Sequence, residues 1–126
     1  MRFLIIIILI LLLIPYSYSW NSKTHEYIVE RVYNSLEIRS SLNLELMKFG
    51  STSPDLVFHD TVLHHYPRSY DKAVYWLNLT NFYLNQNNLD NASYSFGVAS
   101  HYISDSYSIP HHISKEDPKL HSKFEN

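Results

Sequence analysis

The sequence contains no cysteine, so neither disulfide bonds nor thiolate metal ligands contribute to this protein. Glycine is almost absent, with two in 126 residues, which suits a helical chain that needs few tight turns. There is no excess of positive charge, because 10 Lys and Arg residues oppose 12 Asp and Glu residues, and the net charge of −2 argues against a general nucleic-acid-binding surface. Eight histidines are present instead. Histidine without cysteine indicates metal ligation by nitrogen and oxygen.

The first 19 residues have the pattern of a secretory signal peptide. Arg2 supplies a positive charge, an apolar run extends from Leu4 to Ile14, and Ser17 and Ser19 occupy the small-residue positions of a cleavage site. An uncleaved anchor is the alternative, but the run is well short of the roughly 20 residues that a spanning helix needs. We therefore predict a signal peptide over residues 1–19 and a secreted or cell-surface protein.

Cleavage after Ser19 would make Trp20 the first residue of a single mature domain, residues 20–126. A free amine at Trp20 is a potential metal ligand, because its nitrogen and its own carbonyl oxygen can close a five-membered chelate. This ligand would not exist in the uncleaved precursor.

Apolar residues recur with helical spacing along the mature domain. The pattern predicts helices over residues 23–36, 41–49, 70–84 and 91–107, and the start of another over 119–126. Gly50 is predicted to end the second helix, and residues 51–67 to form a long loop that contains Ser53-Pro54-Asp55. No segment alternates with period two for long enough to indicate a sheet. The predicted fold class is all-α, a compact multi-helix bundle.

The strongest functional pattern is the spacing of His101, Asp105 and His111, which reads H-x3-D-x5-H. Helical residues four apart lie on one face, so His101 and Asp105 can bind one ion between them. His111 falls just beyond the predicted helix end, where it can face a neighbouring ion. His121 and Glu125 repeat the four-residue spacing.

Four further candidate ligands lie upstream: His25, Asp55 and the adjacent His64 and His65. Each alone is a weak signal, because a histidine and a carboxylate near each other are more often a surface pair, and an aspartate after a proline is usually a turn former. The order and spacing of the whole set carry the hypothesis of a metal site.

In that order the set resembles the zinc-dependent phospholipase C family and its relatives, the three-zinc single-strand nucleases. The resemblance implies a helical, secreted protein whose mature chain begins with a zinc-binding tryptophan, here Trp20. His25 matches the first family histidine, at a spacing nearer the nuclease branch, and Asp55 matches the loop aspartate. The next family histidine is followed by an aromatic residue, so we prefer His65 and keep His64 as the alternative.

The H-x3-D-x5-H and the closing H-x3-E of the family are both met in full. The sequence departs from the family in two spacings. Asp55 and His65 are closer together than in the well-known bacterial enzymes, and so are His111 and His121. The chain also stops one residue after Glu125, whereas relatives continue through further helices. A compact member, a split gene product and a C-terminally truncated member therefore all stay open.

The resemblance implies a trinuclear site with up to three Zn²⁺ ions. Asp105 would bridge two ions, one held by Trp20 and His25 and the other by Asp55, His65 and His101, while His111, His121 and Glu125 would hold the third. Zinc lowers the pKa of bound water toward ~7, and Asp55 would act as the general base on the water that attacks phosphorus.

Two enzymatic functions fit this expected site. Phospholipase C activity is favoured because the closing motif ends in Glu125, where the nuclease branch usually has aspartate. Single-strand nuclease activity is the alternative, and it fits the short spacing between Trp20 and His25. A metal-binding remnant without activity is the third reading. The expected partners are a phospholipid or other phosphodiester substrate and, transiently, a membrane surface, with no stable nucleic-acid complex.

Overall fold

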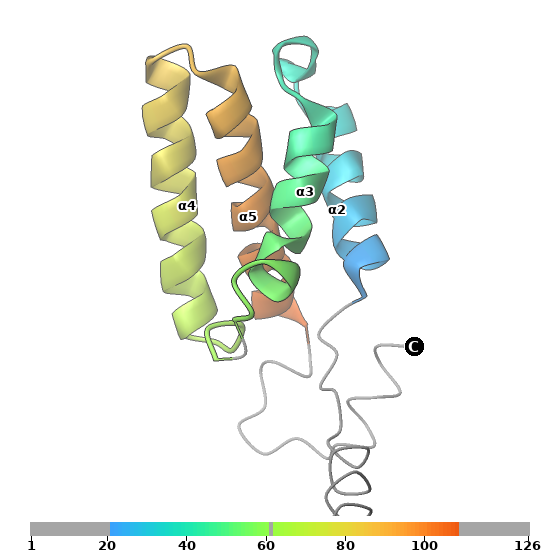
Figure 1. The fold of residues 1–126 in the computed structure, drawn as a ribbon, viewed down its shortest axis with the longest axis vertical. Helices are drawn as coiled ribbons and strands as arrows, with labels where there is room; N and C mark the ends of the chain where they lie inside the picture. Colours follow the sequence, from blue (N-terminus) through green and yellow to red (C-terminus); the bar gives the residue numbers. More distant parts are fainter. Residues whose placement is uncertain (1–20, 61, 109–126) are drawn as a thin grey trace, which may run out of the picture.

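The computed structural model describes residues 21–60 and 62–108. The elements in these residues are α2 (Ser22–Ser35), the short 3₁₀ helix η1 (Arg39–Ser41), α3 (Leu44–Leu56), α4 (Arg68–Asn85) and α5 (Leu89–Tyr107). The described part of the chain contains no strand, so the all-α prediction is confirmed (Figure 1). The predicted signal peptide, Trp20 and the predicted helix over 119–126 lie outside the described residues.

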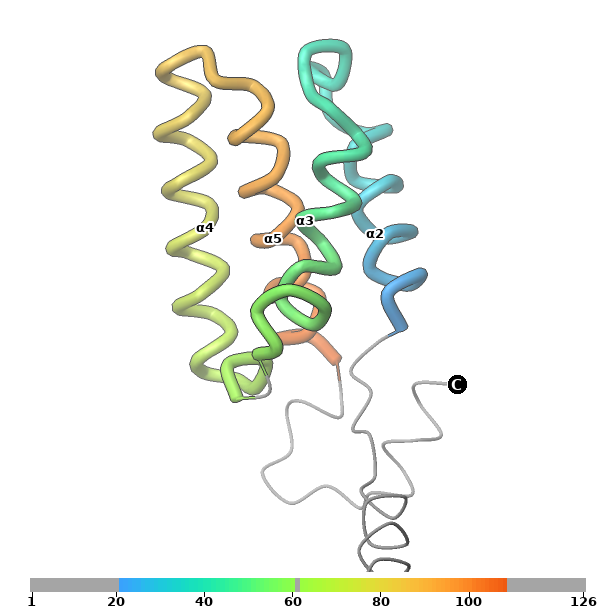
Figure 2. Tube along the Cα trace, in the orientation of Figure 1, coloured from blue at the N-terminus to red at the C-terminus, as the bar shows by residue number. Residues whose placement is uncertain are grey.

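α5 is the central helix of the bundle. It packs against α4 on one side and α3 on the other, and α2 packs mainly against α3 and less extensively against α5 (Figure 1). The tube in Figure 2 shows that successive helices run in opposite directions, so α2 and α4 begin at the end of the bundle where α3 and α5 finish. Residues far apart in the sequence therefore meet at this one end.

Asparagine caps begin three of the described α-helices. The side-chain oxygens of Asn21, Asn43 and Asn88 accept hydrogen bonds from backbone N–H groups in the first turns of α2, α3 and α5. With Asn21 as its cap, α2 begins at Ser22, one residue before the predicted start at residue 23. The bounds of α2, α4 and α5 otherwise match the predicted helices to within about two residues.

The predicted C-terminal end of the second helix was wrong. α3 does not stop at Gly50 but continues to Leu56, and Pro54 lies inside it. Asp55, predicted in a loop, is therefore in the last turn of a helix. Tertiary packing overrides the local turn signals here, because Gly50 through Pro54 are all buried against the rest of the bundle.

The two glycines of the chain allow α3 and α5 to approach closely. A Cβ atom on Gly50 would lie 2.2 Å from the backbone oxygen of Tyr94, and a Cβ atom on Gly97 would lie 2.0 Å from the backbone oxygen of Met47. Gly50 thus serves helix contact and not helix termination. Since backbone atoms cannot move aside as a side chain can, these two positions fix the distance between α3 and α5.

The core is small and lies mostly along α5. Ala73, Val98 and Tyr102 form a buried cluster, with Trp76 and Tyr94 packed against it. On α5, Ala99 is fully buried, whereas Ile103 is partly exposed to solvent. No described helix combines the length and the apolar character needed to cross a membrane.

We expect Gly97→Ala to destabilise the protein severely, because its methyl group would overlap a backbone atom of α3. Overpacking of this kind costs about 1–3 kcal/mol or more of unfolding free energy. Thermal unfolding measures the loss. Asn81→Ala, on the exposed face of α4, is the control and should be neutral. An unchanged melting temperature for Gly97→Ala would contradict this packing.

Candidate metal centre

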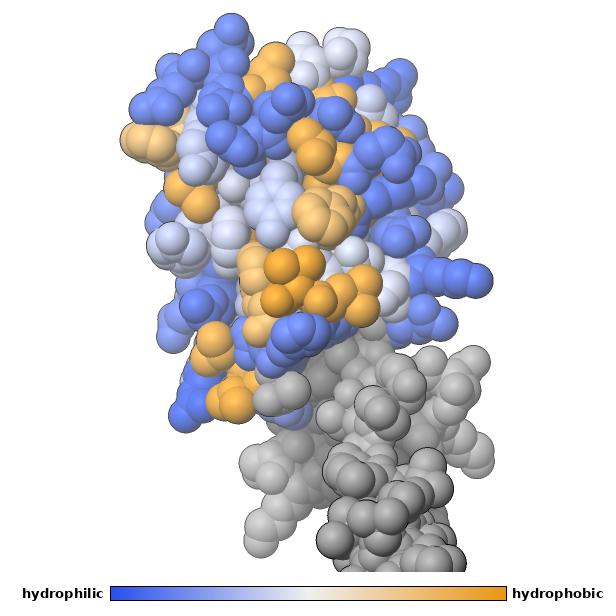
Figure 3. Space-filling model, viewed as in Figure 1, coloured by the Kyte–Doolittle hydropathy of each residue, from blue (hydrophilic) through white to orange (hydrophobic). Residues whose placement is uncertain are grey.

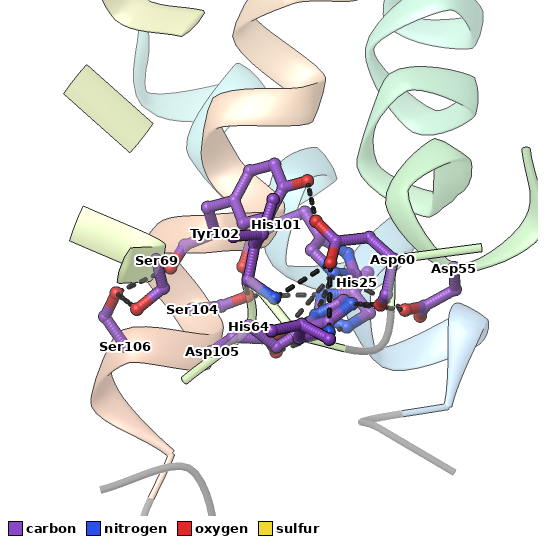
Figure 4. Close-up of polar contacts among 12 residues, drawn as sticks. His25, Asp55, Asp60, His64, Ser69, His101, Tyr102, Ser104, Asp105 and Ser106 are labelled. Carbon is purple, nitrogen blue, oxygen red and sulfur yellow. Dashed lines mark hydrogen bonds and ion pairs between the residues drawn. The ribbon is translucent and has the colours of Figure 1, made fainter. Parts of the chain in front are cut away.

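Three histidines and two aspartates meet at the end of the bundle where α2 and α4 begin (Figure 4). His25 comes from the first turn of α2, Asp55 from the last turn of α3, and His64 from the connection between α3 and α4. His101 and Asp105 lie one turn apart on α5. The antiparallel order of the helices brings these four segments together.

Asp105 lies at the centre of the cluster and is fully buried. Its Oδ2 is 2.6 Å from Nδ1 of His64 and 3.1 Å from Nε2 of His101. Its other oxygen, Oδ1, faces Nε2 of His25 at 3.6 Å. The two oxygens of one carboxylate therefore face different histidines, which is the arrangement that a ligand shared between two ions needs.

Asp55 lies on the solvent side of the cluster. Its Oδ1 is 3.4 Å from Nε2 of His64 and 3.6 Å from Nε2 of His101. The Asp55 side chain is 22% exposed, whereas that of Asp105 is 0% exposed. Asp55 is thus the carboxylate of the cluster that water can reach.

Two overlapping sets of three residues could each hold an ion within the described part of the chain. They are His25, Asp55 and His101, and His64, His101 and Asp105, with the ligand atoms of each set within 4.8 Å of one another. His101 belongs to both sets.

Hydrogen bonds outside the cluster orient two of the histidine rings. Nδ1 of His101 lies 2.8 Å from the backbone oxygen of Ser51, and Nε2 of His64 contacts the backbone oxygen of Asp60. A carbonyl oxygen only accepts hydrogen bonds, so each of these nitrogens carries the hydrogen. Nε2 of His101 and Nδ1 of His64 then turn toward Asp105.

Ser104 orients the third ring. Its hydroxyl donates to the backbone oxygen of His101 at 2.8 Å, which uses its one hydrogen. At its other contact, 3.1 Å from Nδ1 of His25, the hydroxyl oxygen must accept. Nδ1 of His25 is therefore protonated, and its Nε2 faces Asp105.

The donor atoms fit a metal cation. In their neutral forms the three histidines direct nitrogen lone pairs toward the oxygens of a buried carboxylate, and only a positive charge is favourable among such groups. Imidazole nitrogen and carboxylate oxygen are ligands that Zn²⁺ prefers, and outer hydrogen bonds of this kind normally fix the rings of zinc ligands.

The pKa values of the cluster reflect the same need for positive charge. Burial opposes ionisation of Asp105, but its interactions with His101 and His64 outweigh it and hold the pKa of this carboxyl well below its ordinary value. Burial also opposes charge on His64, yet its contact with Asp105 raises the pKa of the imidazole. The pKa of Asp55 is raised by burial.

The structure brings five of the candidate ligands together and separates one from them. The five are His25, Asp55, His64, His101 and Asp105. The preference for His65 over His64 does not match the geometry: His64 is buried in the cluster, whereas His65 is exposed, because the neighbouring side chains point in different directions. Trp20, His111, His121 and Glu125 lie outside the described residues, so the trinuclear site stays a prediction.

The sequence-based search missed two residues that support the cluster, Ser104 and Asp60. Asp60 Oδ1 accepts the backbone N–H groups of Val62 and Leu63, and its Oδ2 accepts the hydroxyl of Tyr102 at 2.8 Å. Asp60 thus ties the connection that carries His64 to α5. An aspartate that bonds the backbone two or three residues further on is a recognised turn signal, which could have pointed to Asp60.

Comparison with known families agrees with this donor set. A family model described as zinc dependent phospholipase C matches residues 24–126. The matched span contains all five clustered residues. No curated protein and no solved structure matched the chain.

We expect Ser104→Ala to weaken zinc binding roughly 10–100-fold, the usual effect of losing a partner that orients a ligand. Titration against a chelating dye measures the affinity. Ser106→Ala is the matched control, since Ser106 lies on the same helix but bonds to Ser69 at 2.8 Å, away from the histidines. Equal zinc affinity in the two variants would contradict the role assigned to Ser104.

The metal-free protein should be most stable at mildly acidic pH. The raised pKa of His64 contributes stability that is present below the unfolded value of about 6.5 and is lost as pH rises through the folded value. The lowered pKa of Asp105 contributes stability present above about 3.9, which is lost as pH falls further.

With zinc bound, the stability of the protein should rise between mildly acidic and neutral pH and not fall. Metal binding displaces protons from the ligands and therefore strengthens as pH rises. Melting curves from pH 5 to 8, with EDTA and with zinc, compare the two forms. A metal-free protein that is more stable at pH 8 than at pH 6 would refute the assignment.

Proposed function

Because the chain belongs to the zinc-dependent phospholipase C family, we propose that it is a hydrolase that cleaves the phosphodiester of phospholipid head groups. The observation that carries this proposal is the convergence of three histidines and two carboxylates from four segments, with Asp105 at the centre. We further propose that Trp20, His111, His121 and Glu125 complete a site for up to three zinc ions.

Bound zinc would supply positive charge for the phosphate and lower the pKa of a bound water toward ~7. The remaining roles, holding the ligands and accepting a proton, belong to residues of the chain. Asp105 holds the ligand nitrogens of His25, His64 and His101 around one carboxylate. Asp55 is partly open to solvent, and burial raises its pKa, so it is the carboxylate placed to accept a proton from the attacking water.

A lipid head group suits this protein better than a long nucleic acid. Nucleic-acid affinity depends on many contacts from Lys and Arg to phosphates, and the chain has a net charge of −2. One phosphodiester needs only the local charge of the metal ions. With the predicted signal peptide removed, the protein would act outside the cell in transient contact with a membrane surface.

The ligand assignment is tested by a pair of neighbouring histidines. We expect His64→Ala to lose zinc and to reduce hydrolysis of phosphatidylcholine roughly a hundredfold or more, because His64 contacts the central carboxylate. His65→Ala should keep both, since His65 is exposed outside the cluster. The opposite result would place the ligand at His65.

The substrate class is tested by offering phosphatidylcholine micelles and single-stranded DNA to the zinc-loaded protein at equal concentration. Release of the phosphorylated head group without DNA cleavage is expected. DNA cleavage without lipid turnover would assign the protein to the nuclease alternative, and zinc binding without either activity would leave a metal-binding protein.

A further inference from the structure

Large apolar side chains are exposed at the end of α3 and along the connection that follows it to α4. They belong to Leu56, Val57, Phe58, Val62 and Tyr66, which we call the apolar rim. Each is more than 40% exposed. Figure 3 shows hydrophobic residues gathered over the lower half of α3 and again near the lower tip of the described bundle. Large apolar side chains that gather at the surface in this way indicate an interaction site.

The apolar rim borders the open side of the metal centre. Leu56 directly follows Asp55, the cluster carboxylate that reaches solvent. Val62 and Tyr66 each lie two residues from His64. A surface that contacts the rim would therefore present its groups directly to the metal ligands.

Several contacts hold the described residues of the connection in place. Asp60, in the middle of the connection, accepts two backbone N–H groups and the hydroxyl of Tyr102. The ring of Phe58 stacks on that of Trp76, with centroids 5.9 Å apart and planes at 9°. The fold thus fixes the connection while it leaves apolar side chains in water, at a cost that only a partner would offset.

The charges around the rim are balanced. Between the end of α3 and the second turn of α4, Asp60 and Asp71 oppose Arg68 and Lys72. A neutral apolar surface with a tyrosine at its edge matches the interfacial region of an uncharged lipid layer, where apolar groups enter and tyrosine meets the head groups. A polyanion such as a nucleic acid would find no excess of positive charge on this surface.

We propose that the apolar rim inserts into the surface of a zwitterionic phospholipid layer and so presents a head-group phosphodiester to the metal centre. This inference rests on the proposed function for the reaction, but binding to lipid is measured without it. Insertion is driven by burial of apolar area and is therefore insensitive to salt.

The test replaces Leu56 and Val57, which are 60% and 50% exposed, by glutamine in one double variant. The matched control carries Ile38→Gln and Phe82→Gln, which are 51% and 52% exposed and lie toward the other end of the bundle. Zinc-loaded proteins are sedimented with phosphatidylcholine vesicles at low and high salt. Hydrolysis of a short-chain phosphatidylcholine, dissolved as monomers, is measured in parallel.

The rim variant should bind vesicles at least about tenfold more weakly than the wild type, as expected from losing the burial of two apolar side chains. The control variant should bind like the wild type. Both variants should keep their zinc and hydrolyse the monomeric lipid at the wild-type rate, because none of the four replaced side chains offers a ligand atom to the metal.

Equal vesicle binding by the rim and control variants would overturn the inference, and so would binding that high salt abolishes. Failure to bind vesicles, together with a dimer that the rim substitutions dissolve, would overturn it in favour of a second copy of the chain as the partner. Rim-dependent binding to vesicles without hydrolysis of any lipid would support the surface and refute the proposed function alone.

Discussion

The buried carboxylate of Asp105 is the constraint on which the metal centre depends. A fully buried negative charge is costly unless positive charge surrounds it, and three histidines from three segments meet that need. Burial opposes charge on His64, but its contact with Asp105 raises the pKa of this imidazole and so favours a positive charge beside the carboxylate. A bound metal ion would supply positive charge at the same place and hold the same segments together.

The close contact of α3 and α5 makes this arrangement possible. Because Gly50 and Gly97 remove side chains from the crossing, the backbone oxygen of Ser51 comes within 2.8 Å of Nδ1 of His101. The continuation of α3 past Gly50 also carries Asp55 to the cluster. Helix packing and ligand orientation are therefore one structural feature.

The connection between α3 and α4 joins the metal centre to the proposed lipid surface. It contributes His64 to the cluster on its inner side and the apolar rim on its outer side. Asp60 anchors it to Tyr102 of α5, so a change in this segment would affect ligand orientation as well as the surface. An enzyme that acts on lipids at an interface would benefit from such proximity, since docking then also orients the substrate.

Much of this protein was determined locally by its sequence. The helical period of apolar residues predicted the all-α fold, and the bounds of three helices matched to within about two residues. The four-residue spacing of His101 and Asp105 placed both on one face of a helix, and this local geometry needs no other part of the chain. The order of the candidate ligands also indicated the zinc-dependent phospholipase C family, to which the chain belongs.

Tertiary structure decided what local patterns leave open. His64 and His65 are chemically equal neighbours, and only the path of the connection determines which of them is buried. In the sequence, Gly50 indicates the end of a helix. In the structure it lies against the backbone of Tyr94, and the close contact explains why a glycine is needed there. The hydrogen of each ring was fixed by acceptors distant in sequence, such as Ser51, which lies 50 residues from His101. Sequence sets residue type and local spacing, whereas burial, ring orientation and close approach depend on contacts between segments that only the folded chain brings together.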